Sequence, residues 1–202
     1  RDDVELVRAG PGGDVSLARF EPPLLVADVG GERVELEVPF TGRYQARNVL
    51  SALGAYRALG LPLARAGAGA PSIRISAWRG EEVELPGGGL LINDAYNANP
   101  VSMRAALVHL AATAGARRRV AILGDMAELG PGGPAFHEEI GREAARHGVE
   151  ALLAVGELSR GYLDGAAGVP VARWVADAEA AVAEARDLVE PGDCVLVKAS
   201  RA

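Results

Sequence analysis

The sequence predicts an α/β protein with a doubly wound, mainly parallel sheet in its C-terminal part, preceded by a part that is β-rich and then helical. From residue 73 onward short apolar runs alternate with helical stretches, and this order implies parallel strands joined by right-handed crossovers. The composition, 49% hydrophobic and 24% charged over 202 residues, is that of a globular chain with room for one large or two small cores.

Antiparallel strands are expected before residue 40, where short apolar runs lie between turns rich in glycine and proline. These runs are 4–7, 15–18, 24–27 and 34–38. From about Gln45 the apolar spacing becomes helical, and Gly60 ends it. The alanine-, glycine- and proline-rich segment 61–72 then predicts a linker, so we expect one domain over 1–72 and a second over 73–202.

The second part alternates strands and helices throughout. Strands are predicted near 82–85, 90–93, 119–123, 151–155, 171–174 and 194–197, and helices near 100–114, 134–147, 159–166 and 177–189. Asn99 before Pro100 is a favourable helix start, and Gly115 and Gly148 stand where helices tend to end. Ligands bind beyond the carboxyl ends of such strands. The candidate functional loops are therefore 94–99, 124–128, 156–157 and 198–201.

Charge and composition exclude several partners and compartments. A net charge of -6, from 21 basic and 27 acidic residues, gives no electrostatic footprint for nucleic acid. No apolar stretch approaches the roughly 20 residues that cross a bilayer. The single cysteine, Cys194, lies in an apolar run, which favours a buried structural thiol in a protein of the reducing cytoplasm.

Lysine is almost absent, since Lys198 is the one lysine among the 21 basic residues. A phosphate loop needs glycine immediately before its lysine, and Val197 stands there instead. The chain therefore carries no Walker loop. It also has no initiator methionine and stops soon after a strand-like run, so we expect a piece of a longer protein.

The segment 94–100 joins a buried strand to a helix start and has two interpretations. Asp94 at the strand end could accept hydroxyl protons from a ribose, and amides beside the helix start could hold an anion. Alternatively Asn99 is a plain N-cap, with Asp94 and Asn97 bracing the turn.

The segment 124–130 follows the next clearly predicted strand and also has two interpretations. Asp125 and Glu128 could meet an ammonium group or a metal ion, or could be solvated loop charges. His137 could sit in a polar pocket or on the surface. Arg79 could bind a phosphate, or it could form a salt bridge at the surface. In the second case its neighbour Trp78 would anchor the hydrophobic core.

Several catalytic motifs are missing. The segment at His137 lacks the second histidine of H-E-x-x-H, and neither His109 nor His147 has a partner at ligand spacing. We therefore predict no zinc site at these histidines. No serine lies in a G-x-S-x-G elbow. A formal G-x-G-x-x-A match at 130–135 follows no strand and contains two prolines, so it predicts no dinucleotide site.

Two long segments together resemble the Mur ligases. They are 93–107, which begins Asn93-Asp94-Ala95-Tyr96-Asn97-Ala98-Asn99-Pro100, and 123–130, which reads Leu123-Gly124-Asp125-Met126-Ala127-Glu128-Leu129-Gly130, followed by His137 and Ile140-Gly141. Weaker agreement covers 42–55, Trp78-Arg79 with Glu81, and 197–201. The resemblance therefore extends from about residue 40 to the end.

The resemblance implies a three-domain enzyme. Residues 1–72 would be the C-terminal part of its central ATPase domain, and 73–202 a Rossmann-like C-terminal domain without its last helix. An upstream part would hold the phosphate loop, the magnesium ligands and the domain for the uridine nucleotide.

The resemblance also implies roles for individual residues. Asn48 would contact adenine, Arg79 a phosphate and Asp94 the ribose. The loops at Asn97, Asn99, Asp125, Glu128 and His137 would face the incoming dipeptide, with Lys198, Ser200 and Arg201 as further candidates. The resemblance assigns no catalytic residue and no metal ligand to this chain.

The implied reaction is ATP-dependent amide formation with Mg²⁺. It would join D-alanyl-D-alanine to UDP-N-acetylmuramoyl-tripeptide through an acyl phosphate, in a cytoplasmic monomer that makes peptidoglycan precursors. This chain alone would be inactive.

Two positions depart from the family pattern, and two other functions stay open. Tyr44-Gln45 replaces the usual histidine and its amide neighbour, and Ala199 replaces a glycine. One alternative function is a non-catalytic module that binds nucleotide or peptide. The other is a dehydrogenase, which would need a glycine fingerprint that the chain lacks.

Overall fold

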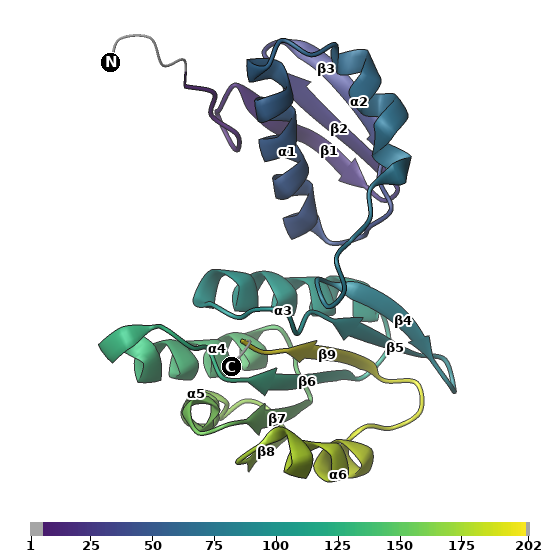
Figure 1. Ribbon diagram of the computed structural model, residues 1–202. Coiled ribbons are helices and arrows are strands. Elements are labelled where there is room, and N and C mark those ends of the chain that lie inside the picture. The colour runs from purple at the N-terminus through teal and green to yellow at the C-terminus, as the bar shows by residue number, and fades with distance from the viewer. Residues whose placement is uncertain (1–5, 201–202) are drawn as a thin grey trace. The chain divides into compact units, whose positions relative to one another are not determined.

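A computed structural model describes residues 6–200 of the chain. Its contacts divide it into two compact units between Ile75 and Ser76. Each unit has its own hydrophobic core and is described by itself (Figure 1).

The first unit is an antiparallel sheet with helices against it (Figure 1). Its strands β1 (Val15–Glu21), β2 (Leu24–Val29) and β3 (Glu32–Glu37) pair in the order β1-β2-β3, which confirms the predicted meander. Helix α1 (Arg43–Ala58) confirms the helical spacing from Gln45. For the predicted run 4–7, residues 4 and 5 lie outside the described residues, and Leu6 and Val7 are not in a strand.

The predicted linker 61–72 is wrong. Helix α2 (Leu63–Gly69) and the 3₁₀ turn η1 (Ala70–Ser72) occupy it. Alanine has the highest intrinsic helix propensity, and Leu63 and Ala66 pack against the first core. This packing outweighs the helix-weakening glycines of the segment.

The second unit contains a six-stranded sheet in the order β4-β5-β9-β6-β7-β8. Its strands are β4 (Glu81–Leu85), β5 (Gly89–Asn93), β6 (Arg119–Gly124), β7 (Ala151–Val155), β8 (Val171–Val175) and β9 (Cys194–Lys198). All neighbours are parallel except β4 and β5. The turn 86–88 between those two strands is too short for a parallel crossover, so the sheet is mainly parallel, as predicted.

Helices cover both faces of this sheet. The helices are α3 (Pro100–Ala114), α4 (Gly133–Arg146), α5 (Gly161–Gly165) and α6 (Ala178–Leu188), with 3₁₀ turns η2 (Gly130–Gly132) and η3 (Leu158–Arg160). One set of strand side chains packs in a core with α3, α4 and α5, while the alternate set packs with α6. Side chains alternate along a strand, so this division confirms the doubly wound fold.

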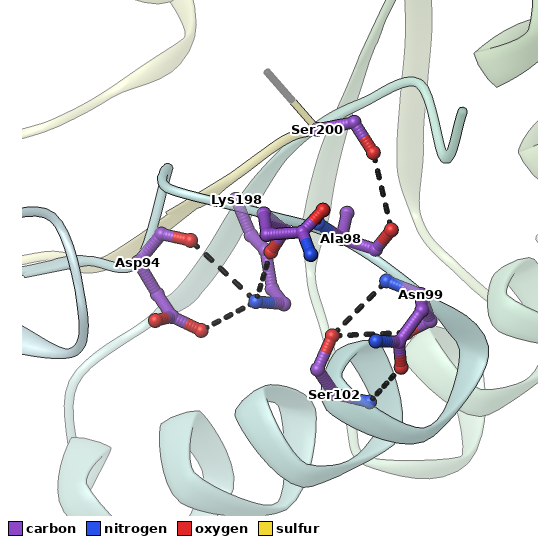
Figure 2. Close-up of polar contacts among 7 residues, drawn as sticks. Asp94, Ala98, Asn99, Ser102, Lys198 and Ser200 are labelled. Carbon is purple, nitrogen blue, oxygen red and sulfur yellow. Dashed lines mark hydrogen bonds and ion pairs between the residues drawn. The ribbon is translucent and has the colours of Figure 1, made fainter. Parts of the chain in front are cut away.

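Three local predictions have clear outcomes. Asn99 is the N-cap of α3, where its Oδ1 accepts from the Ser102 amide at 2.9 Å (Figure 2). Cys194 is buried, and burial raises the pKa of its thiol to about 11, which confirms a structural thiol. Trp78 is wrong as a core anchor, because it is 48% exposed.

Among residues 6–200, no helix is long and apolar enough to span a membrane.

Candidate functional site

The candidate site lies at the carboxyl ends of the strands of the second unit. Strands β5, β9, β6 and β7 are consecutive neighbours, and all four run parallel. Their following loops therefore meet at one edge of the sheet. These are the loops that begin at Asp94, Ala199, Asp125 and Gly156.

A buried ion pair lies at the centre of this edge. Lys198 at the end of β9 is 2% exposed, and Asp94 after β5 is 8% exposed. The Lys198 Nζ donates to Asp94 Oδ2 at 2.6 Å and to the Asn97 carbonyl at 2.8 Å (Figure 2). Burial lowers the pKa of Lys198, and the attraction of Asp94 opposes this shift. One ammonium group thus fixes both ends of the turn 94–97.

Ser200 joins the loop after β6 to the loop after β5. Its Oγ donates to the Ala98 carbonyl at 3.1 Å (Figure 2) and accepts from the Ala127 amide at 3.0 Å. Its own amide donates to the Asp125 carbonyl at 2.9 Å. The segment 198–200 therefore holds the loops after β5 and β6 together.

Ala199 fits between these contacts because it faces a glycine. A Cβ placed on Gly124 would lie 2.6 Å from the Ala199 Cβ. The alanine that departs from the family pattern is thus accommodated opposite Gly124.

The Asp125 side chain is hydrogen-bonded to the loop after β7. Its Oδ1 accepts from the Ser159 amide at 2.6 Å. Gly156, at φ +107°, passes so close that a Cβ there would lie 2.6 Å from the same carboxylate. Among the described residues no group of three histidine, cysteine, aspartate or glutamate side chains could hold a metal ion. Asp125 is therefore neither a fully solvated loop charge nor part of a visible metal site.

His137 is fully buried, so the expectation of a surface histidine is wrong. The Met126 amide donates to its Nε2 at 3.0 Å, and its Nδ1 lies 2.7 Å from the Gly133 carbonyl. An amide can only donate, so Nε2 is unprotonated and Nδ1 carries the proton. The ring has no surface for a ligand, which corrects the expectation of direct dipeptide contact. Its contact with Met126 instead supports the loop after β6.

Tyr162 supports the same loop, and the sequence analysis missed it. Its hydroxyl donates to the Gly124 carbonyl at 2.7 Å, and its ring centroid lies 4.9 Å from that of His137. Burial raises the pKa of this phenol far above its ordinary value. Only the position of Tyr162 shortly after β7 could have indicated this role.

Tyr162→Phe is expected to lower the free energy of unfolding by about 1–3 kcal/mol, because the Gly124 carbonyl stays buried without its donor. Urea unfolding followed by tryptophan fluorescence measures this, since Trp78 and Trp174 both lie in the second unit. Tyr56→Phe, in α1 of the first unit, is the control and should leave that transition unchanged. An equal free energy of unfolding for both variants would show that the Tyr162 hydroxyl does not stabilise the second unit.

Asn97 and Asn99 of the loop after β5 and Glu128 of the loop after β6 are exposed polar side chains of the edge. Asn97 Oδ1 accepts from the Ala98 amide at 2.8 Å, and Asn99 caps α3. Glu128 has a left-handed backbone at φ +62°, a conformation that costs free energy in a residue with a side chain. Amides and a carboxylate are thus presented beside a helix N-terminus, where they could bind the amine and carboxylate of a small peptide.

Arg79 is exposed and lies against Tyr96, with its Cζ 3.8 Å from the ring centroid. Its positive charge also lowers the pKa of Lys198, after burial as the main cause. Arg79 therefore belongs to the same edge as Asp94.

The other two candidates are not among the described residues of the second unit. Asn48 is an exposed residue of α1 in the first unit. Arg201 lies outside the described residues. The second unit thus brings most of the predicted site residues together at one edge of its sheet. They are Arg79, then Asp94, Asn97 and Asn99 after β5, Asp125 and Glu128 after β6, and Lys198 and Ser200 at the end of β9.

Comparison with protein families identifies the second unit. Residues 78–201 match the family described as "Mur ligase, glutamate ligase domain". This range contains every candidate residue of the strand-end edge.

Two relatives carry the same name, UDP-N-acetylmuramoyl-tripeptide--D-alanyl-D-alanine ligase. That of Mycobacterium tuberculosis strain H37Rv is 36% identical over 224 residues, which cover 100% of this chain and 43% of the relative. That of Bacillus subtilis strain 168 is 29% identical over 171 residues, 81% of this chain and 36% of the relative. The chain thus spans less than half the length of these relatives.

Solved structures give the same fold. MurF from Acinetobacter baumannii superposes with a TM-score of 0.82 at 28% identity, covering 95% of this chain and 43% of that one. MurF ligase from Thermotoga maritima, in complex with ADP, superposes with a TM-score of 0.77 at 22% identity, covering 94% and 44%. At that lower identity the likeness shows the fold alone.

Proposed function

The chain belongs to the Mur ligase family, and from this premise we propose that it forms the C-terminal part of an ATP-dependent ligase that joins D-alanyl-D-alanine to UDP-N-acetylmuramoyl-tripeptide. The observation that carries the proposal is the 36% identity, over the whole chain, to a relative with that printed activity. The strand-end edge, which lies inside the family match, supports it.

The two units have different parts in this proposal. Residues 1–72 are the C-terminal part of the central ATPase domain, which contributes Asn48 to the adenine. Residues 73–202 are the C-terminal domain that binds the dipeptide. The observed division between Ile75 and Ser76 is compatible with these assignments.

Within the second domain the proposal separates a nucleotide side from a dipeptide side. Asp94 accepts hydrogen bonds from ribose hydroxyls through its carboxylate, and Arg79 donates to a phosphate with its planar fork. The dipeptide meets Asn97, Asn99, Asp125 and Glu128. His137, Lys198 and Ser200 act indirectly, because their polar atoms hold the loops that carry these side chains.

The reaction has two steps. The terminal carboxylate of the tripeptide attacks the γ-phosphorus of ATP, which forms an acyl phosphate and releases ADP. The dipeptide amine then attacks the acyl carbon, loses a proton, and displaces phosphate to leave the amide. The chain's own residues contribute by positioning and by stabilising charge.

Mg²⁺ belongs to the proposal as a companion of ATP. The described residues offer no group of ligands for it, so no step is assigned to it here. The proposal also includes a monomer in the cytoplasm, where ATP and uridine nucleotides are available.

Phosphate release tests this function. The protein of the complete reading frame and the present 202-residue chain are each mixed with magnesium ATP, UDP-N-acetylmuramoyl-tripeptide and D-alanyl-D-alanine. We expect release from the complete protein only, dependent on both substrates, because this chain has no phosphate loop. No release from either protein would favour the non-catalytic binding module. Release from the present chain alone would contradict the need for an upstream phosphate loop.

A further inference from the structure

The aromatic ring of Tyr96 lies against the guanidinium group of Arg79. The guanidinium carbon lies 3.8 Å from the centroid of the Tyr96 ring, which is well within the range of a cation–π contact. Tyr96 itself lies two residues after Asp94, in the turn that Lys198 fixes. The contact therefore joins the segment before β4 to the loop after β5.

Backbone hydrogen bonds hold the two segments in register. The Tyr96 amide donates to the Trp78 carbonyl at 3.0 Å, and the Gly80 amide donates to the Asn93 carbonyl at 2.9 Å. Trp78 at φ +63° and Gly80 at φ +77° both have left-handed backbones. Arg79 thus projects from a tightly turned segment, and its place over the ring does not depend on side-chain packing alone.

We propose that Tyr96 is a positioning residue, which holds the Arg79 guanidinium over its ring so that the N–H edge of the guanidinium is presented to a phosphate of the nucleotide. This inference rests on the proposed function. A guanidinium that stacks on an aromatic ring keeps the N–H donors along its edge available. A guanidinium that is already held in its binding position also loses less side-chain entropy when the phosphate binds. Without the ring, the Arg79 guanidinium would lose this contact and the restraint that the contact provides.

The neighbouring charges favour an anionic ligand at this place. Lys198 is buried and paired with Asp94, whereas Arg79 is exposed. The positive charge of Arg79 is close enough to lower the pKa of Lys198, after burial as the main cause, so an exposed cation lies near the Asp94–Lys198 pair. A ribose bound by Asp94 and a phosphate bound by Arg79 would then belong to the same nucleotide.

The test compares Tyr96→Leu with Tyr96→Phe in the complete protein. Leucine removes the aromatic face, whereas phenylalanine keeps the face and removes only the hydroxyl. We expect Tyr96→Leu to lower kcat/KM for ATP by about two- to thirty-fold, the range of a cation–π contact, and Tyr96→Phe to change it little. Thermal unfolding is recorded for both, because a merely structural role would move stability and ATP kinetics together.

Arg79→Ala supplies the second arm as a double-mutant cycle. We expect Tyr96→Leu to have no further effect on kcat/KM for ATP when Arg79 is already alanine. Equal kinetics for Tyr96→Leu and Tyr96→Phe, or additive effects with Arg79→Ala, would overturn the positioning role while the ligase activity stands. An unsubstituted protein without phosphate release would overturn the proposed function and this inference together.

Discussion

Lys198→Met is expected to lower the free energy of unfolding by about 3–5 kcal/mol, the usual cost of removing one partner from a buried ion pair. The Asp94 carboxylate would stay buried without its ammonium partner, and the Asn97 carbonyl would lose its donor. Methionine fills nearly the same volume, so that the change removes charge rather than packing. Urea unfolding followed by tryptophan fluorescence measures the loss in the second unit.

Two variants separate this effect from a general loss of charge. Arg47→Met removes a positive charge from an exposed site in α1, and should change stability by no more than about 0.5 kcal/mol. The double variant Lys198→Met/Asp94→Leu removes both charges, and it should be more stable than Lys198→Met alone because no lone carboxylate remains. A double variant that is less stable than the single one would show that the pair is not the source of the effect.

The elements of the second unit were predictable from local signals. Asn99-Pro100 starts a helix and Gly115 ends it, and both signals act within a few residues. The apolar runs of β5, β6, β7 and β9 are buried on both faces of the sheet, which makes them visible as continuous hydrophobic segments. Alternation of these elements then implied the sheet, the crossovers and the edge at which candidate residues gather.

The contacts that shape the site were not predictable in the same way. Lys198 and Asp94 are separated by 104 positions in the chain, and they meet only because β9 lies between β5 and β6. No local pattern specifies that strand order. The burial of His137 likewise depends on Met126 of the loop after β6, 11 positions earlier, and on Tyr162 of α5, and no local pattern specifies that these residues pack around the ring.

The helix in the alanine-rich segment 61–72 was not predictable for a related reason. The segment 61–72 has the composition of a linker, yet it is helical because the first core offers a surface for Leu63 and Ala66. Tertiary packing decides such marginal cases.

Gly165→Ala is expected to lower the free energy of unfolding of the second unit by about 1–3 kcal/mol or more, through overpacking between α4 and α5. A Cβ at this position would lie 1.9 Å from the Glu138 carbonyl oxygen and 2.8 Å from the Arg142 amide nitrogen. Both atoms belong to the backbone of α4, so that no side chain can rotate to make room. Helix α5 would have to move away, and Tyr162 would move with it. The same urea transition by tryptophan fluorescence measures the loss.

The reciprocal site gives an independent check of this close approach. A Cβ on Gly141 of α4 would lie 2.0 Å from the Tyr162 carbonyl oxygen, so Gly141→Ala should destabilise the unit to a similar extent. Gly69→Ala in α2 is the matched control, because a Cβ there meets nothing within 4 Å and the backbone is already helical at φ -84°. It should leave the fluorescence transition unchanged. If Gly165→Ala unfolds at the same urea concentration as Gly69→Ala, α4 and α5 do not pack as closely as the glycines require.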